Sequence, residues 1–136
     1  MIKKLPKTDN KYNGWELNFF DNAKNFRLYQ LQLIRKFLNG YIAEVGPGNG
    51  KNLTYYKNIP IKIDLFEPSK KLYKNLKKTF KKNKKINFYN KNFNSTSNKY
   101  NAILYLDVLE HIKDDAQEIK LAFRSLKRGG FLIINV

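Results

Sequence analysis

The residues best suited to chemistry lie in the segment 42–50, which reads Ile-Ala-Glu-Val-Gly-Pro-Gly-Asn-Gly. An apolar run that carries Glu44 leads directly into three glycines, Gly46, Gly48 and Gly50. Glycine reaches positive φ freely and has no Cβ, so it allows a backbone to approach a ligand closely. The pattern therefore predicts a buried strand followed by a tight turn that lies against a ligand.

A second carboxylate, Glu67, comes 21 residues after Gly46, at the end of the apolar run 61–66. At the tip of the strand that follows a glycine-rich turn, a carboxylate is suited to accept hydrogen bonds from two ribose hydroxyls. In the competing interpretation, Glu67 only caps the helix expected to begin at Ser69. The spacing favours the ribose and so predicts a cofactor that contains adenosine.

The spacing within the turn distinguishes between such cofactors. A dinucleotide-binding turn follows GxGxxG, whereas here Lys51 takes the place of the third glycine and the pattern is GxGxG. Glu44 comes two residues before the first glycine. A carboxylate there matches the ammonium and sulfonium charges of S-adenosylmethionine (SAM) better than a pyrophosphate. Glu44 as an ordinary strand-edge carboxylate is the alternative, but burying an unpaired charge is costly and favours a function.

Four segments in the right order resemble the class I SAM-dependent methyltransferases: 44–50, 64–69, 105–112 and 126–134. The resemblance implies a Rossmann-like three-layer α/β sandwich with a mainly parallel sheet of about five strands. It also implies SAM as cofactor, S-adenosylhomocysteine as product, and transfer of a methyl group to an acceptor. The sequence does not identify that acceptor; a small molecule is the class expected.

The resemblance also implies roles for individual residues. Glu44 is expected near the methionine ammonium, and Asp107, which ends the fourth strand, near the amino-acid end of the cofactor. Asn92 takes the place of an acid that usually contacts the adenine amino group, and its carbonyl oxygen can still accept. Phe93 either stacks on the adenine or fills the core. The expected cofactor-binding set is Glu44, Gly46, Pro47, Gly48, Glu67, Pro68, Asn92, Phe93, Asp107 and Val108.

Other residues keep two interpretations. Gly46 and Gly48 are expected to make room for the ligand, whereas Gly50 has helix packing alone as its second interpretation. His111, the single histidine, is either a general base or a loop histidine bonded to backbone. No catalytic residue is assigned and no metal is expected. Four N-terminal aromatic residues form either a lid over the cofactor or helix-packing core: Trp15, Phe19, Phe20 and Phe26.

Alternating patterns predict the elements that position these residues. Strands are expected at 41–45, 61–67, 86–89, 102–106 and 131–136, with helices at 18–38, 49–56, 69–82 and 114–127. Residues 1–40 are expected to form a helical segment that packs on the core 41–136, within a single domain. Three helices are expected to face their apolar residues inward: Phe19, Ala23, Phe26, Leu28, Leu31, Ile34 and Leu38 in the first, Leu72, Leu76 and Phe80 in the third, and Ile119, Ala122, Phe123 and Leu126 in the fourth.

The composition is strongly basic, with a formal net charge of +16. Of the 27 basic residues 23 are lysines, and Lys, Asn, Ile, Phe and Tyr make up 72 of the 136 residues, as an AT-rich genome would produce. Arginine is preferred for gripping phosphate, so nucleic acid is disfavoured as the main partner. The nine lysines between Lys70 and Lys85 are read first as a solvated helix face and second as a polyanion-binding face, the latter suiting an RNA-binding methyltransferase.

The absence of cysteine and of long apolar runs excludes further classes of protein. With no cysteine, no thiolate attacks a pyrimidine ring, and no apolar run of about 18 residues predicts a membrane span. A cytoplasmic location is expected. The resembling fold has seven strands, whereas this sequence ends after the fifth, which would be an exposed edge. We expect a fragment, a homodimer paired through the fifth strands, or a SAM- or nucleotide-binding module without transferase activity that a partner completes.

Overall fold

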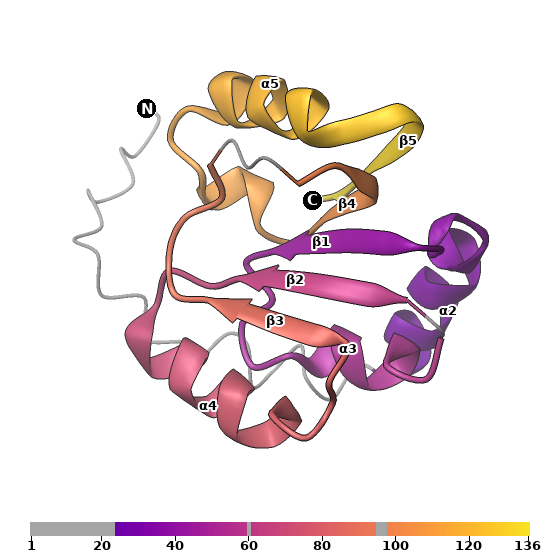
Figure 1. Ribbon diagram of the computed structural model, residues 1–136, viewed down its shortest axis with the longest axis vertical. Coiled ribbons are helices and arrows are strands. Elements are labelled where there is room, and N and C mark those ends of the chain that lie inside the picture. Colours follow the sequence, from indigo (N-terminus) through magenta and orange to yellow (C-terminus); the bar gives the residue numbers. More distant parts are fainter. Residues whose placement is uncertain (1–23, 60, 95–97) are drawn as a thin grey trace, which may run out of the picture.

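The structure, a computed structural model, describes residues 24–59, 61–94 and 98–136. Five strands form one parallel sheet in the order β3-β2-β1-β4-β5 (Figure 1). This arrangement confirms the Rossmann-like α/β architecture, because parallel strands are joined by crossovers, usually helical, and the helices cover both faces of the sheet. The strands are β1 Tyr41–Val45, β2 Lys62–Phe66, β3 Ile86–Tyr89, β4 Tyr100–Leu106 and β5 Leu126–Asn135.

The helices form the two outer layers. Figure 1 shows α2, α3 and α4 on one side of the sheet and α5 on the other. Each layer buries its own apolar cluster against the sheet, one around Leu53, Leu76 and Phe80 and one around Tyr105 and Ala122. The helices are α2 Lys24–Ile34, α3 Lys51–Tyr56, α4 Lys70–Phe80 and α5 Asp115–Ser125, with short 3₁₀ turns η1 Arg35–Phe37 and η2 Leu109–His111. None of the described helices is long and apolar enough to cross a membrane.

Two helices begin at their predicted first residues, where a side chain caps the helix. The Ser69 hydroxyl accepts from the amide of Leu72 at 3.4 Å, and an Asp114 carboxylate oxygen accepts from the amide of Gln117 at 3.0 Å. Side-chain oxygens at these positions satisfy amides that have no partner within the helix. Both starts are therefore confirmed at the predicted residues.

The inward face of α2 differs from the prediction. Phe26 and Leu28 are exposed, whereas Arg27, Gln30 and Ile34 are buried. These three are spaced i, i+3, i+7, which is one face of a helix. The prediction was wrong for Phe26 and Leu28, whereas the inward positions of Ile34 and Leu38 are confirmed. The start of the predicted helix, with Phe19 and Ala23, lies outside the described residues.

The predicted boundary between the last helix and strand was also wrong. α5 ends at Ser125 and β5 begins at Leu126, so Gly129 and Gly130 lie inside a strand. The register between β4 and β5 shifts after Tyr100, and this irregularity absorbs Gly129 at a φ of 75°. Phe123 was predicted to face inward but is 75% exposed.

The connection from β3 to β4 spans the ten residues 90–99. β3 is an edge strand, so this segment crosses β2 and β1 to reach β4, and its described part contains no helix. Beneath it lies Asp64, which is fully buried in the middle of β2. Its carboxylate accepts hydrogen bonds from Tyr41 at 2.5 Å, Tyr100 at 2.7 Å, Asn87 at 2.8 Å and Asn98 at 3.3 Å.

Candidate functional site

The strand order places the candidate site between β1 and β4. The chain leaves β1 toward β2 and β3 and then returns on the other side of β1 with β4, so the carboxyl ends of β1 and β4 flank a topological switch point. A hollow of about 50 Å³ lies there. It is lined by Arg27, Gly46, Pro47, Asn49, Lys51, Asn52, Leu106 and Asp107.

Side-chain packing, and not only room for a ligand, requires glycines in the turn after β1. Gly46 has a φ of 64°, and a Cβ on it would come within 2.4 Å of the Val108 side chain. The space beside Gly46 is thus taken by Val108, which brings the turn after β1 against the turn after β4. Gly50 has a φ of 76°, and a Cβ there would meet Leu76 and Phe80 at 2.6 Å, so Gly50 is needed for packing against α4.

Glu67 joins this turn to the end of β2. Its carboxylate accepts from the amide of Gly48 at 3.0 Å and from the amide of Ser69 at 2.8 Å. Burial raises its pKa, and these two hydrogen bonds oppose the rise. A carboxylate has about four acceptor positions, so two remain available. Glu67 is only 4% exposed, and it holds the glycine turn while keeping capacity for further donors.

Glu44 lies one layer behind the hollow. It is 1% exposed, does not line the hollow, and accepts a hydrogen bond from the hydroxyl of Tyr56 on α3. Burial raises its pKa to about 8, although the Arg27 guanidinium and the Asn52 side chain oppose that rise. The free energy of removing a charge from water thus dominates here.

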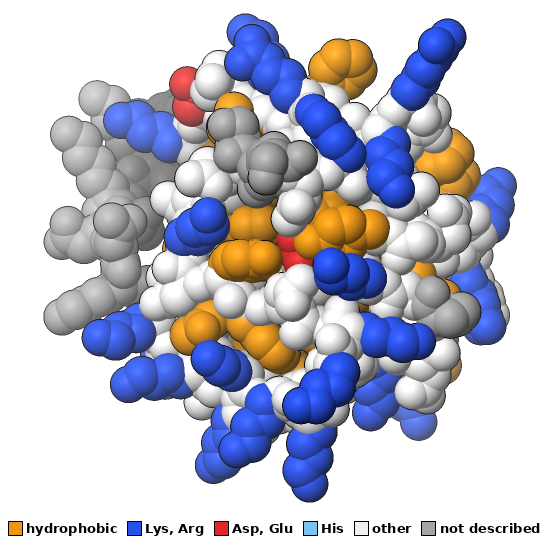
Figure 2. Space-filling model, in the orientation of Figure 1, with side chains coloured by type: hydrophobic (Ala, Val, Ile, Leu, Met, Phe, Trp, Pro, Cys, Tyr) orange, Lys and Arg blue, Asp and Glu red, His pale blue; other side chains and the backbone are white. Residues whose placement is uncertain are grey.

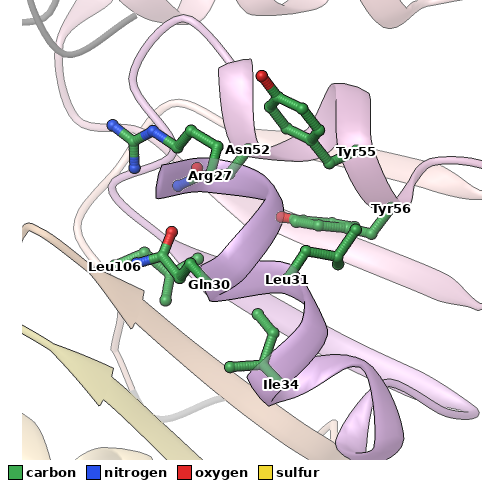
Figure 3. Close-up of a pocket in the computed structure, with 8 residues that line it drawn as sticks. All are labelled: Arg27, Gln30, Leu31, Ile34, Asn52, Tyr55, Tyr56 and Leu106. Carbon is green, nitrogen blue, oxygen red and sulfur yellow. The ribbon is translucent and has the colours of Figure 1, made fainter. Parts of the chain in front are cut away.

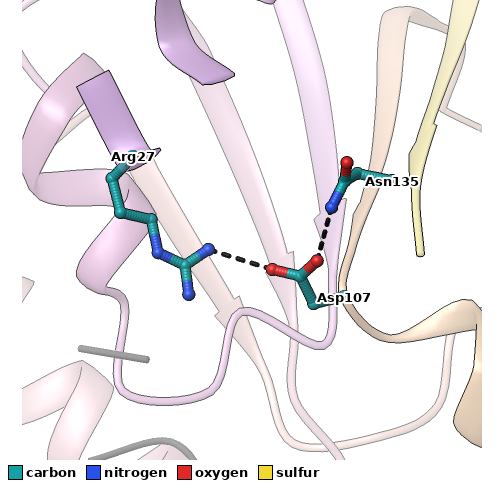
Figure 4. A network of polar contacts seen from close by, with 3 residues as sticks. All are labelled: Arg27, Asp107 and Asn135. Carbon is teal, nitrogen blue, oxygen red and sulfur yellow. Dashed lines mark hydrogen bonds and ion pairs between the residues drawn. The ribbon is translucent and has the colours of Figure 1, made fainter. Parts of the chain in front are cut away.

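Asp107 is the polar centre of the hollow. One oxygen accepts from Arg27 Nη1 at 3.0 Å, and the other accepts from the Asn135 amide on β5 (Figure 4). Asp107 has a φ of 57°, which L residues seldom adopt and which turns the chain sharply at the end of β4. Three distant segments, α2, the end of β4 and β5, therefore converge on one carboxylate.

Arg27 is the residue that the sequence prediction missed. Figure 3 shows it with Gln30, both on α2, among the residues that line a small pocket together with Asn52 and Tyr56 of α3. Its Nε and the Nε2 of Gln30 are buried and have no hydrogen-bond partner among the described residues. A signal was present: Arg27 is one of only four arginines among 27 basic residues, and its spacing to Ile34 places it on the helix face that is buried.

The residues expected beside the adenine do not line the hollow. Phe93 is 3% exposed and packs edge-on against Phe66, with ring centroids 5.0 Å apart, which favours the core alternative. Asn92 and Pro68 are exposed near the ends of β3 and β2. His111 is exposed at the end of η2, and Phe26 is exposed on α2. The other lid candidates, Trp15, Phe19 and Phe20, lie outside the described residues.

Several solved structures share this fold. One is a predicted S-adenosyl-L-methionine-dependent methyltransferase from Methanococcus maripaludis, with a TM-score of 0.73 and 19% identity over 98% of this chain and 66% of that one. A DhpI complex with S-adenosylhomocysteine (SAH) has a TM-score of 0.68 and 13% identity over 93% and 63% of the two chains. The glycopeptide N-methyltransferase MtfA, complexed with SAM, has a TM-score of 0.65 and 13% identity over 79% and 48%.

This chain thus spans between about half and two thirds of the length of these proteins. No curated protein matches the sequence significantly. A family model described as a methyltransferase domain matches residues 19–136, which is most of the chain. The chain belongs to the methyltransferase domain family and has the Rossmann-like fold of the SAM-dependent methyltransferases.

Proposed function

We propose that this chain binds SAM at the carboxyl ends of β1, β2 and β4 and transfers its methyl group to a small-molecule acceptor. The observation that carries the proposal is Glu67, a buried carboxylate that holds the glycine turn through Gly48 and keeps two acceptor positions available. Those positions suit the two hydroxyls of a ribose. Membership of the methyltransferase domain family supports the same reaction class.

The hollow fits the amino-acid end of the cofactor. Arg27 and Asp107 present a cation and an anion 3.0 Å apart, and an α-amino acid carries the complementary carboxylate and ammonium. The unpartnered Nε of Arg27 adds a donor for a carboxylate. Glu44, buried behind the turn, contributes a negative potential once the cationic ligand lowers its pKa.

The cofactor, when bound, supplies the methyl group on a sulfonium. The remaining task of the chain is to align the acceptor with that methyl group and to exclude water. No general base is assigned, because an acceptor that is already nucleophilic needs none. We also propose a cytoplasmic location. A further proposal is that two copies pair through β5, which is an outer strand of the described sheet.

Titration of the chain with SAH tests the cofactor site directly. We expect binding that weakens at least about tenfold in Glu67→Ala, because hydrogen bonds to a charged acceptor contribute about 1.5–3 kcal/mol. Arg27→Met should weaken binding as well, since SAH keeps the carboxylate. Glu110→Ala, which removes an exposed acid from η2, is the matched control and should bind like the parent chain. Equal affinity in Glu67→Ala and Glu110→Ala would contradict the assignment.

A second candidate is a SAM- or nucleotide-binding module without transferase activity. The observation in its favour is that this chain spans 66% or less of the similar solved structures named above. Formation of SAH from SAM in the presence of candidate acceptors separates the two functions. Product that depends on both the chain and an acceptor excludes the binding module, whereas tight SAH binding without any such product supports it.

A further inference from the structure

Charge is distributed unevenly along this chain. Residues 51–99 contain fourteen lysines, no arginine and only two acidic residues, Asp64 and Glu67. All fourteen lysines are exposed, whereas both acids are buried. Residues 107–136 instead contain five acidic and five basic residues. One part of the surface is therefore strongly positive and another is balanced.

Genome composition does not account for this difference. A bias toward lysine codons acts on the whole chain, so it should raise the charge of both segments alike. The sequence argument that disfavoured nucleic acid as the main partner was drawn from total composition, which contains no information about position. The asymmetry needs an explanation that is specific to the segment 51–99.

The charge is concentrated on a surface that we call the lysine face. Lys70 and Lys71 lie in the first turn of α4, which contains no acidic residue, although a helix N-terminus favours anions. Lys70, Lys74 and Lys78 repeat at i, i+4, where like charges repel. The lower part of Figure 2, where α4 runs in Figure 1, shows basic side chains and no acidic one. The face consists of Lys70, Lys71, Lys74, Lys77, Lys78, Lys81, Lys82, Lys84 and Lys85.

The surroundings of the lysine face distinguish between polyanionic partners. Membrane-binding surfaces combine basic residues with large apolar side chains that insert into the bilayer. The exposed large apolar side chains of the described residues all lie at 26–33 or 123–136, outside this face. Lysine acts as a point charge that holds phosphate without reading a base. A flexible chain of phosphates therefore fits better than a lipid surface.

A half-buried tyrosine within the lysine face favours a single strand. Lys77 Nζ lies 5.8 Å from the centre of the Tyr73 ring, and both residues belong to α4. The Tyr73 side chain is partly exposed, and aromatic rings beside cations are platforms for unpaired bases. α4 begins at Lys70, three residues after Glu67, so this surface starts beside the candidate cofactor site.

We propose that the lysine face binds the phosphate backbone of single-stranded RNA without sequence preference. This proposal is independent of the methyltransferase proposal, because it concerns a different surface and needs no turnover. The probe is a fluorescein-labelled oligouridylate of about 20 nucleotides, followed by anisotropy. Binding should weaken steeply between about 50 and 200 mM salt, since bound lysines release counterions.

Two variants with the same change in net charge make the test specific. The first variant changes four lysines of the lysine face to Gln, namely Lys70, Lys74, Lys77 and Lys78. The second changes four basic residues elsewhere to Gln, namely Lys113, Lys120, Arg124 and Arg128. All eight residues are exposed. The first variant should bind at least about tenfold more weakly. The slope of the logarithm of its binding constant against the logarithm of salt concentration should also become shallower by about 2 to 3, because each lost phosphate contact lowers that slope by about 0.7. The second should retain most of the affinity and slope.

Other outcomes overturn the proposal. Equal losses in the two variants would show that binding reflects net charge alone. Affinity that does not change with salt would exclude backbone contacts. Tighter binding to vesicles containing phosphatidylserine than to the oligouridylate would assign the face to a membrane. Circular dichroism of both variants verifies that the fold is intact, so that a loss of binding is not a loss of structure.

Discussion

Two carboxylates lie three residues apart at β2, and their surroundings differ. Asp64, in the middle of the strand, accepts from four side chains, Tyr41, Asn87, Asn98 and Tyr100. Glu67, just past the strand, accepts from two backbone amides. A carboxylate with all acceptor positions filled by its own chain has a structural role, whereas one with positions left over can take a ligand.

Replacing Asp64 should have the largest effect on stability. In Asp64→Ala the four donors lose their acceptor, and buried unsatisfied donors each cost about 1–3 kcal/mol without adding fully. We expect the free energy of unfolding to fall by about 3–5 kcal/mol. Urea denaturation measures this fall. Asp64→Asn, which keeps one acceptor oxygen, is the matched variant and should lose less. A stable Asp64→Ala protein would show that the network contributes little.

Glu44 sharpens the comparison, because it is buried like Asp64 but has a raised pKa. A folded-state pKa of about 8, against about 4.5 unfolded, means that the folded chain binds an extra proton between these values. Stability should therefore fall as the pH rises from about 4.5 to 8 and level off above. Glu44→Gln lacks this titration, so its free energy of unfolding should exceed that of the parent by several kcal/mol at alkaline pH, since each unit of pKa shift corresponds to about 1.4 kcal/mol.

Unfolding of the two proteins in urea at several pH values checks the Glu44 prediction. The difference between them is expected to grow across the window and to be absent near pH 4.5. The slope shared by both proteins comes from other groups, among them Glu67, whose pKa is also raised. Parallel pH profiles would show that Glu44 keeps its charge in the folded chain.

Glu67→Ala should cost stability only modestly. Its two partners are backbone amides in turns, of Gly48 and Ser69, and the Ser69 contact is only partly buried, so water replaces it. We expect a loss of about 1 kcal/mol in the free energy of unfolding, alongside the large loss of SAH affinity. A destabilisation as large as that of Asp64→Ala would remove the distinction between the two carboxylates.

The smallest change tests one donor alone. Tyr41→Phe removes a hydroxyl that donates to Asp64 at 2.5 Å, but Tyr41 is only partly buried. Water can reach the site, so the expected loss is about 0.5–1 kcal/mol, measured by thermal unfolding. Tyr100→Phe removes a fully buried donor to the same carboxylate and should cost more. The reverse order would indicate that burial does not set these contributions.

The carboxyl ends of the strands could be predicted from the sequence because local patterns determine them. The run 61–67 and the glycines that follow Val45 identified the turns where Glu67 and Gly48 meet. Periodicity within one segment, together with glycine geometry, suffices for such positions. β3 was placed at its observed residues for the same reason.

The features that the sequence did not predict depend on contacts between residues far apart in the chain. Arg27 faces inward because Asp107, eighty residues later, offers it a partner, and no pattern within α2 shows that partner. Phe123 is exposed because the described chain places nothing over that face of α5, although its spacing suits a core. The four partners of Asp64 come from β1, β3, β4 and the preceding loop, so strand register decides the network.

The ten-residue crossing from β3 to β4 has a consequence for how the molecule opens. Its described residues form no helix, so helical hydrogen bonds do not hold them together. They contact the rest of the chain through Phe93 on Phe66, through Asn98 on Asp64, and through the Asn90 side chain, which donates to the carbonyls of Glu67 and Pro68. Local openings follow the least protected units of a fold. The amides of the crossing's described residues should therefore exchange with solvent hydrogen earlier than those of α4, so the two faces of the sheet open on different timescales.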